Sequence, residues 1–236
     1  DFDPVYAKAK CNNNEELEAA ARELGISKKV LEIFPSEFEE SELGMIPEGW
    51  EVQSIYDVAN IIYGAPFSSK NFNDTQTGRP LIRIRDLKTF NSQHWTEEEH
   101  VKGTLIKAGD LLIGMDAEFT PTIWQGIDGW LNQRVLKVVP INGTFTAFQY
   151  FALKPKMRFF EQANVGTTVI HLGKKDIDTI KMLVPSREIL EQSGLILEPL
   201  FKQLVHNSQQ NRNLQNTRDT LLPKLLSGEL DVSEVE

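Results

Sequence analysis

The sequence has one cysteine, four histidines and no long apolar run, and each shortage excludes a class of protein. Cys11 alone cannot form an internal disulfide, which suits a reducing compartment. No apolar segment approaches the ~20 residues that span a bilayer, and no signal-peptide pattern is present. We therefore expect a cytoplasmic protein that does not associate with membranes. Because the sequence starts at Asp1 without a Met, we expect a processed chain or, preferably, a fragment of a longer one.

Residues that would carry catalysis are also scarce. No glycine-rich phosphate loop and no Asn/Asp-Pro-Pro-aromatic motif of a base methyltransferase is present. Cys11 has no histidine nearby, and Asp116 and Glu118 are spaced as turn residues as readily as an acid–base pair. The histidines lack metal-site spacing: His94, His100, His171 and His206. The residues alone predict a protein that is not an enzyme and needs no cofactor.

Negative charge dominates the chain, with a formal net charge of −9, but it lies at the two ends. Residues 1–50 carry 5 basic and 12 acidic side chains, and residues 186–236 carry 5 and 8. Residues 51–185 carry 15 basic and 14 acidic side chains, a net charge of +1. The overall acidity therefore does not exclude nucleic acid as a partner, because a local patch decides such binding.

The middle of the chain predicts a mostly β core within an α+β fold. A short helix over Glu15–Leu24, closed by Gly25, and an acidic connector over Ser36–Glu42 precede it. A helix over Ala147–Phe160 interrupts the β-like segments, and Gly173–Asp178 turns between the last two. The expected strands cover Ala59–Tyr63, Pro80–Asp86, Leu111–Met115, Leu131–Val139, Val169–Leu172 and Thr179–Val184.

The segment Ile196–Leu226 predicts one long helix, with Pro199 in its first turn and Ser227-Gly228 as its stop. Steps of three and four residues define a coiled-coil seam with three polar positions. A long helix with so thin an apolar stripe should not be stable alone, so the pattern indicates a partner helix. Asn207 and Asn211 would then fix the register of the pair. The alternative is a helix that lies on the surface of its own domain. The seam is Leu197, Leu200, Leu204, Asn207, Asn211, Leu214, Arg218, Leu221 and Leu225.

Polar loops between the predicted strands carry side chains suited to DNA. Arginine, lysine, asparagine and glutamine read base edges, and lysine and arginine also bind phosphates. The alternative for each is an ordinary solvated side chain, and Arg83 or Arg85 can instead pair with Asp86 or Asp110. The candidates for DNA contact are Lys70, Asn71, Arg79, Arg85, Gln93, Lys174 and Lys175.

Ordered sequence blocks resemble the specificity (S) subunits of type I restriction–modification systems. Residues 1–8 (DFDPVYAK) resemble the central segment of these subunits, and residues 43–52 (LGMIPEGWEV) the start of a target recognition domain. Further blocks are residues 80–87, 109–113, 131–135, 170–185 and 221–230. The chain departs from the family at Arg85, where a small residue is frequent, and at Ala117-Glu118-Phe119, where a glycine-containing turn is common.

The resemblance implies a non-catalytic subunit that reads one half of a bipartite site in double-stranded DNA. It divides the chain into a connector (1–42), a target recognition domain (43–185) and a helical spacer (186–236). The implied partners are the methyltransferase and restriction subunits and a second long helix, from the other half or from a second copy. Leu200, Leu204, Asn207, Asn211, Leu214 and Leu221 would pair the helices. The alternative is an interaction module that assembles or regulates such a complex without reading DNA.

Overall fold

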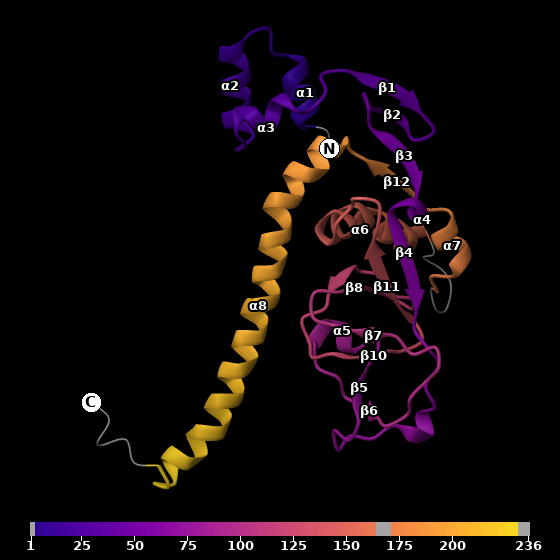
Figure 1. Cartoon of the computed structure of the whole chain (residues 1–236), viewed down its shortest axis with the longest axis vertical. Coiled ribbons are helices and arrows are strands. Elements are labelled where there is room, and N and C mark those ends of the chain that lie inside the picture. Colours follow the sequence, from indigo (N-terminus) through magenta and orange to yellow (C-terminus); the bar gives the residue numbers. More distant parts are fainter. Residues whose placement is uncertain (1–2, 164–170, 231–236) are drawn as a thin grey trace.

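The computed structural model describes residues 3–163 and 171–230 and shows an α+β chain in three spatial parts (Figure 1). A small helical unit at one end leads through a β-hairpin into a globular part with a β core. A long C-terminal helix then runs back beside the globular part. The helical unit contains α1 (Asp3–Ala9), α2 (Asn14–Glu23) and α3 (Lys28–Glu32).

Local side chains determine the ends of the short helices, as the sequence predicts. The side chain of Asn13 accepts hydrogen bonds from the backbone N–H groups of Glu15 and Glu16 in the first turn of α2, and Gly25 follows that helix with φ +69°. Ser27 accepts from the backbone N–H of Val30 and starts α3.

The segment Ser36–Glu42, expected to be a solvated connector, is largely a strand. β1 (Phe38–Ser41) pairs with β2 (Gly44–Pro47) in an antiparallel hairpin. Gly44 has φ +88°, and the hydroxyl of Ser41 donates to its carbonyl at 2.8 Å, which closes the turn. The acidic side chains Glu39 and Glu40 are exposed, as a solvated segment requires. Charge alone predicted their exposure but not their pairing.

The main sheet of the globular part is covered on both faces. Its strand order is β4-β11-β8-β9. Successive side chains of β8 alternate: Leu111 and Ile113 join the core beneath the helices, whereas Leu112 joins the core against the second sheet. Both sets are buried, so β8 is apolar throughout. The bounds are β4 (Ala59–Tyr63), β8 (Leu111–Gly114), β9 (Thr122–Ile123) and β11 (Val135–Pro140).

The second sheet has the order β6-β5-β10-β7 and contains the parallel pair β5–β10. It covers the face of the main sheet that the helices leave open. Two short helical segments, η1 (Ser69–Asn71) and α5 (Asp86–Thr89), flank β5. The strands are β5 (Arg79–Ile82), β6 (Trp95–Thr96), β7 (Leu105–Ile106) and β10 (Gly129–Leu131).

Two expected strands are interrupted in the structure. The strand predicted over Pro80–Asp86 ends at Ile82, because Asp86 folds back to accept the N–H of Arg83 at 2.9 Å and opens α5. The strand predicted over Leu131–Val139 is two strands, β10 and β11, in different sheets. A turn through Arg134, whose φ is +72°, separates them. Apolar composition does not reveal such breaks, since the flanking residues on both sides are buried.

Helices and a two-stranded ribbon complete the globular part. α6 (Thr146–Ala163) confirms the predicted helix and includes Pro155. The predicted turn Gly173–Asp178 is the short helix α7 (Lys174–Asp178), and β12 (Lys181–Val184) pairs with β3 (Glu51–Ser54). α4 (Ile55–Val58) follows β3. Of the expected strand Val169–Leu172, residues 169 and 170 lie outside the described ranges.

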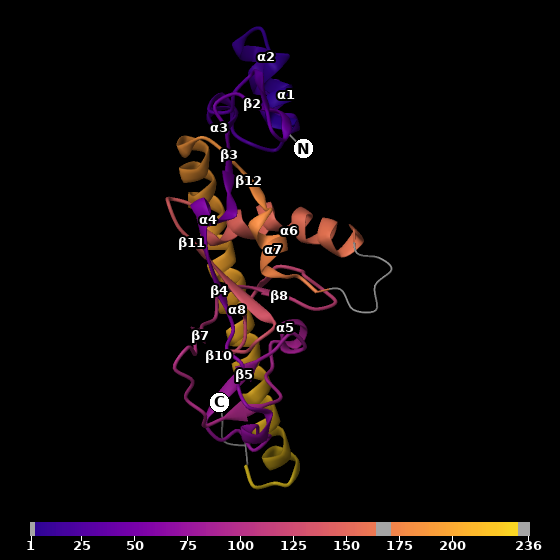
Figure 2. The same cartoon turned by 90° about the vertical axis from the view of Figure 1, so that its right-hand side faces the viewer.

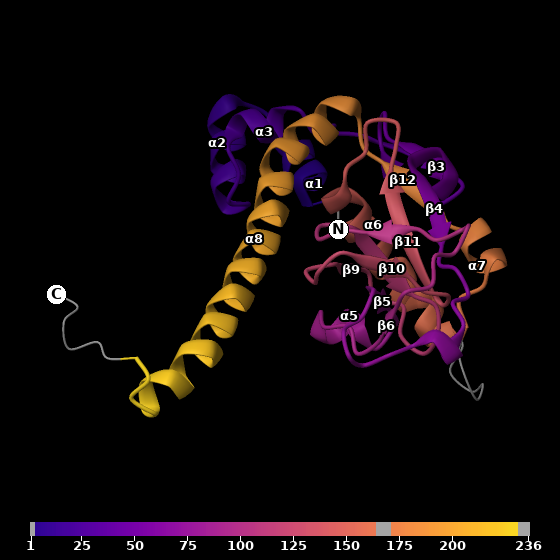
Figure 3. The ribbon, with the colours of Figure 1, turned by 60° about the horizontal axis from the view of Figure 1, so that its bottom comes forward.

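α8 (Arg187–Leu226) spans 40 residues, about 60 Å. It starts at the predicted opening of the helical spacer, nine residues before the segment Ile196–Leu226 that carries the seam; Ile189 and Leu190 are buried, and Leu190 joins the core of the globular part. Pro199, which was predicted in the first turn, therefore lies inside the helix. Ser227 and Gly228, with φ +73°, end the helix as predicted. Figures 1 and 3 show its C-terminal end lying away from the globular part.

Candidate nucleic-acid interface

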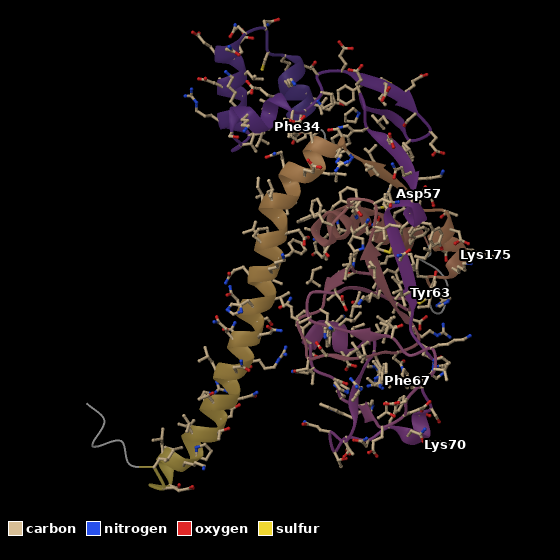
Figure 4. The ribbon with its side chains drawn as sticks, viewed as in Figure 1. Phe34, Asp57, Tyr63, Phe67, Lys70 and Lys175 are labelled. Carbon is tan, nitrogen blue, oxygen red and sulfur yellow. The ribbon has the colours of Figure 1, made fainter. Side chains whose placement is uncertain are left out.

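Lys70 and Asn71 lie on η1, at the end of the globular part farthest from the helical unit (Figure 4). Both are exposed. The carboxylate of Glu98 accepts from the side-chain amide of Asn71 at 2.9 Å and from the backbone N–H of Ser68 at 3.0 Å. Asn71 therefore helps to order the loop that presents Lys70.

Arg79 lies close to this loop through an aromatic stack. Its guanidinium lies 5.4 Å from the ring centroid of Trp130, within cation–π distance. The Trp130 ring in turn lies 5.7 Å from that of Phe67, two residues before η1 begins. The structure thus brings Lys70, Asn71 and Arg79 to one end of the second sheet.

Arg85 and Gln93 form a second group, around the corner that follows β5. The buried carboxyl of Asp86 accepts the N–H of Arg83 and lies 3.8 Å from the Arg83 guanidinium. Burial raises the pKa of Asp86, while hydrogen bonds from the backbones of Arg83 and Gln93 oppose the rise. Of the two arginines that could pair with Asp86, Arg83 does so, and Arg85 is exposed.

Lys174 and Lys175 form a third group on α7, and both are exposed. The backbone N–H of Gly173 donates to Asp176 at 2.7 Å and closes the first turn of α7. The hydroxyl of Tyr56 donates to Asp178 at 2.5 Å and ties α7 to α4. Burial and this bond raise the pKa of Tyr56 above its ordinary value, so the hydroxyl keeps its proton.

Figure 4 shows Lys175, Tyr63, Phe67 and Lys70 in succession along the edge opposite α8. Figure 2, in which that edge faces the viewer, shows α7 in front of the sheets and α8 behind them. The first and third groups therefore share one side of the globular part. Arg85 and Gln93 flank the opposite end of β5 from Arg79, at α5.

A fourth polar group was missed from the sequence. His171 Nδ1 lies 2.7 Å from Asp116 Oδ1, and Arg134 Nη1 lies 3.4 Å from the same oxygen. The backbones of Ala117 and Arg134 are left-handed, with φ +64° and +72°, a conformation that disfavours side chains other than glycine. Ala117 stands where the family commonly has a glycine-containing turn. Arg134 and His171 come from two separate family-like blocks, and Asp116 from the loop after a third; only the fold brings them together.

α8 presents two parallel stripes with different surroundings. Phe201 and Val205 pack on the core, and Phe201 lies 5.5 Å from the ring of Tyr150 on α6. This half-buried stripe follows steps of four and three: Gly194, Glu198, Phe201, Val205, Ser208 and Arg212. The predicted seam lies one residue before it, about 100° around the helix. The alternative of a helix that lies on its own domain is thus correct for the half-buried stripe. The apolar pattern of the sequence predicts only the seam and not this stripe.

The predicted seam itself is uncovered in the single chain. Leu200 is 59% exposed, Leu204 46%, Leu214 67% and Leu221 41%. Asn207 and Asn211 are also exposed, and Gln203 donates to the side-chain oxygen of Asn207 at 2.7 Å. Exposed leucines at regular spacing identify a surface that burial would stabilise.

A groove of about 570 Å³ lies between α8 and the globular part and borders this seam. Its walls are mainly apolar and come from α5, α6, the segment around β9, and α8. Leu204 and Phe201 line it from α8, and Phe151 and Tyr150 from α6. The seam and the groove thus form one continuous surface.

Metal-binding clusters and membrane-spanning helices are both absent from the described residues. Residues 3–163 and 171–230 contain no cluster of three or more His, Cys, Asp or Glu side chains that could hold a metal ion. No helix within the same ranges is long and apolar enough to cross a membrane.

Comparison with curated proteins identifies relatives by sequence. The chain is 31% identical over 190 residues to the specificity subunit of the type I restriction enzyme EcoBI from Escherichia coli, covering 78% of the chain and 40% of the relative. It is 27% identical over 270 residues to the HindI specificity subunit from Haemophilus influenzae, covering 98% of the chain and 59% of that subunit. The chain thus spans about half the length of these relatives.

Solved structures share the fold at low sequence identity. The HsdS subunit from Thermoanaerobacter tengcongensis matches with a TM-score of 0.50 and 19% identity, over 92% of this chain and 54% of that one. A chain from a structure of the type I R-M system matches with a TM-score of 0.51 and 19% identity, over 89% and 53%. The sequence profile of the type I restriction modification DNA specificity domain matches residues 47–216, which include the globular part and most of α8. By this match, the chain belongs to the family of type I restriction–modification DNA specificity domains.

Proposed function

We propose that this chain is a non-catalytic DNA-recognition subunit that reads one half of a bipartite site in double-stranded DNA. The family match across residues 47–216 is the observation that carries the proposal, because it includes both the candidate reading domain and the helix. The proposed parts are a connector (1–42), a target recognition domain (43–185) and a helical spacer (186–236). We propose the cytoplasm as its compartment, because its proposed target is cellular DNA.

The side of the globular part opposite α8 is the proposed phosphate-binding face. Lys70, Lys174 and Lys175 are exposed on it and act as point charges toward the DNA backbone. The Tyr56–Asp178 bond supports α7, so that its lysines are presented from a fixed element. Arg134 adds a guanidinium from a left-handed turn, and Asp116 restricts its orientation.

Sequence reading falls to the polar side chains at the ends of β5. Arg79 and Arg85 are exposed arginines of the kind that bind guanine, and Gln93 of the kind that binds adenine. Asn71, whose amide nitrogen is held by Glu98, adds a side-chain oxygen as a hydrogen-bond acceptor. The bases themselves do not follow from these residues.

The exposed seam of α8 is the proposed docking surface for a second long helix. Leu200, Leu204, Leu214 and Leu221 supply the apolar contacts, and Asn207 and Asn211 the register. That helix comes from another half-subunit or from a second copy of this chain. Methyltransferase and restriction subunits complete the assembly and bring the chemistry.

Replacement of the reading domain within the intact system tests this proposal. Residues 50–185 are exchanged for the matching region of a relative, and methylated motifs are mapped by long-read sequencing. We expect one half of a bipartite motif to change, while the other half and the gap stay fixed. An unchanged motif would contradict the proposal.

The second candidate is an interaction module that assembles or regulates the complex without reading DNA. The exposed leucine seam favours it, since this surface needs a protein partner and not DNA. A chain that binds the methyltransferase subunit but shows no preference for specific DNA over random DNA would favour this candidate.

A further inference from the structure

Two side-chain hydrogen bonds, from Glu198 and Arg212, join α8 to the globular part at two points along the helix. We call this pair of contacts the clamp. The carboxylate of Glu198 accepts the backbone N–H of Ala147 at 3.0 Å. The guanidinium of Arg212 donates to the backbone carbonyl of Gln125 at 2.7 Å. The two side chains are 14 residues apart, about 21 Å along α8. Both lie on the half-buried stripe, so they face the same body.

The anchor for Glu198 is the first turn of α6. Ala147 is fully buried, and its N–H has no partner within α6 because it belongs to the first turn. A carboxylate at this position satisfies that group and interacts favourably with the positive end of the helix. The contact thus joins the two longest helices of the chain near the N-terminal third of α8.

The anchor for Arg212 is a rigid loop. Trp124, beside Gln125, is fully buried, and its backbone N–H and carbonyl both bond to the turn at 109–110 at 2.8 Å. The Trp124 ring donates to the carbonyl of Ile127 at 2.9 Å. A Cβ atom at Gly126 would lie 2.1 Å from that ring, so the loop closes tightly over it. The accepting carbonyl therefore has little freedom to follow the helix.

Arg212 is the last described contact of α8 with the globular part. From Gln209 to Leu226 every residue is exposed except Arg212 and Lys224, and Lys224 pairs with Glu229 beyond the helix end. The hydrogen bond from Arg212 to the carbonyl of Gln125 has a charged donor and is partly buried, and hydrogen bonds with a charged donor are among the stronger kinds. Without it, α8 would be held only by contacts N-terminal to Gln209.

We infer that Glu198 and Arg212 are positioning residues that fix the angle between the reading domain and α8, and thereby the gap between the two half-sites. The second clause rests on the proposed function. The helix acts as a lever: Leu226 lies twice as far from Glu198 as Arg212 does. A displacement of about 1 Å at Arg212 therefore becomes about 2 Å at Leu226. One base pair of gap moves a half-site by about 3.4 Å along the DNA axis and rotates it by about 34°.

The first experiment measures the angle without DNA. In a Cys11→Ser background, spin labels are placed at Glu97→Cys in the globular part and Asp219→Cys on α8. The labelled chain is diluted with unlabelled chain, and the label distance is measured by pulsed electron resonance. We expect Arg212→Ala to broaden the distribution about twofold, Arg212→Lys to restore much of the narrow width, and Lys202→Ala, an exposed cation on the same helix, to leave it unchanged. An unchanged width in Arg212→Ala would overturn the clamp.

The second experiment measures gap selectivity in the complete methyltransferase complex. DNA substrates carry the two half-sites at a series of gap lengths, and methylation is measured on each. We expect Arg212→Ala to lower the preference for the best gap over gaps one base pair away by about tenfold, with Lys202→Ala unchanged. Affinity of the chain for a single half-site should stay the same.

The outcomes separate the two proposals. A broadened label distribution with unaltered gap selectivity would overturn the role of the clamp in spacing. A loss of half-site affinity in Arg212→Ala would assign Arg212 to reading and overturn the inference as well. If the unsubstituted complex has no bipartite preference, the proposed function fails, and the label distances alone decide whether the clamp exists.

Discussion

The globular part and α8 use leucine in opposite ways. Leu112 in the main sheet is fully buried between two layers, whereas Leu214 on α8 is 67% exposed. The first region has its core within its own fold, and the second leaves its apolar seam exposed. The difference shows that the domain is stabilised by its own core, whereas the outer part of α8 has little apolar burial of its own.

Unfolding measurements give the largest contrast between the two regions. Leu112→Ala leaves a cavity between the two sheets and should lower the free energy of unfolding by about 2–5 kcal/mol. Leu214→Ala should change it by no more than about 0.5 kcal/mol in the dilute single chain. Denaturant titrations of both variants test the comparison. Equal losses would contradict it.

Association of helices should respond to the seam and not to the rest of α8. Leu214→Asp with Leu221→Asp removes two apolar contacts and should weaken pairing with a second seam-bearing chain at least a hundredfold. Asn213→Asp with Asn216→Asp adds the same charge to exposed positions outside the seam and serves as the matched control. Sedimentation velocity at several concentrations separates the variants. Similar weakening by both pairs would indicate a general charge effect.

DNA affinity should respond to the globular part and not to the helical unit. Lys174→Ala with Lys175→Ala should reduce the slope of log affinity against log salt by up to about 1.8, or about 0.9 for each phosphate contact. Lys29→Ala, an exposed lysine on α3, should leave the slope unchanged. Fluorescence anisotropy at several salt concentrations gives both slopes. An unchanged slope in the double variant would remove α7 from the proposed interface.

The smallest expected effect concerns the buried carboxyl at the corner after β5. Because burial raises the folded-state pKa of Asp86 above 3.8, the folded chain binds more protons than the unfolded chain between the two pKa values. This group therefore lowers the free energy of unfolding as the pH rises through that window. We expect the free energy of unfolding of Asp86→Asn, measured against that of the unsubstituted chain at the same pH, to increase from acid to neutral pH. A relative loss over the same range would show the opposite sign of pKa shift.

Sequence periodicity predicted the elements whose ends are marked by local chemistry. Ala59–Tyr63, the helix closed by Gly25 and the stop at Gly228 were all predicted from a few adjacent residues. The break at Asn132–Arg134 and the early end of β5 were not. Both depend on which sheet the next residue joins, and that choice is made by distant strands.

The candidate site was predictable only residue by residue. Exposed lysines on loops were singled out correctly as exposed, but their grouping on one side required the positions of η1 and α7 (Figure 4). The Asp116–His171–Arg134 group joins residues as much as 55 positions apart, which no local pattern reveals. The half-buried stripe of α8 was missed because only two of its six residues, Phe201 and Val205, are large and apolar.

The ribbon formed by β3 and β12 has a consequence for how such a chain can change over generations. Ser54 is paired with Lys181 and Glu51 with Val184, so the globular part begins and ends at adjacent positions. A new insert between these two strands would leave the helical unit and α8 where they are, provided its own ends meet the same ribbon. Recombination at this ribbon would exchange the whole globular part, with its candidate DNA-contact residues, as one segment, and the length of α8 would be inherited separately.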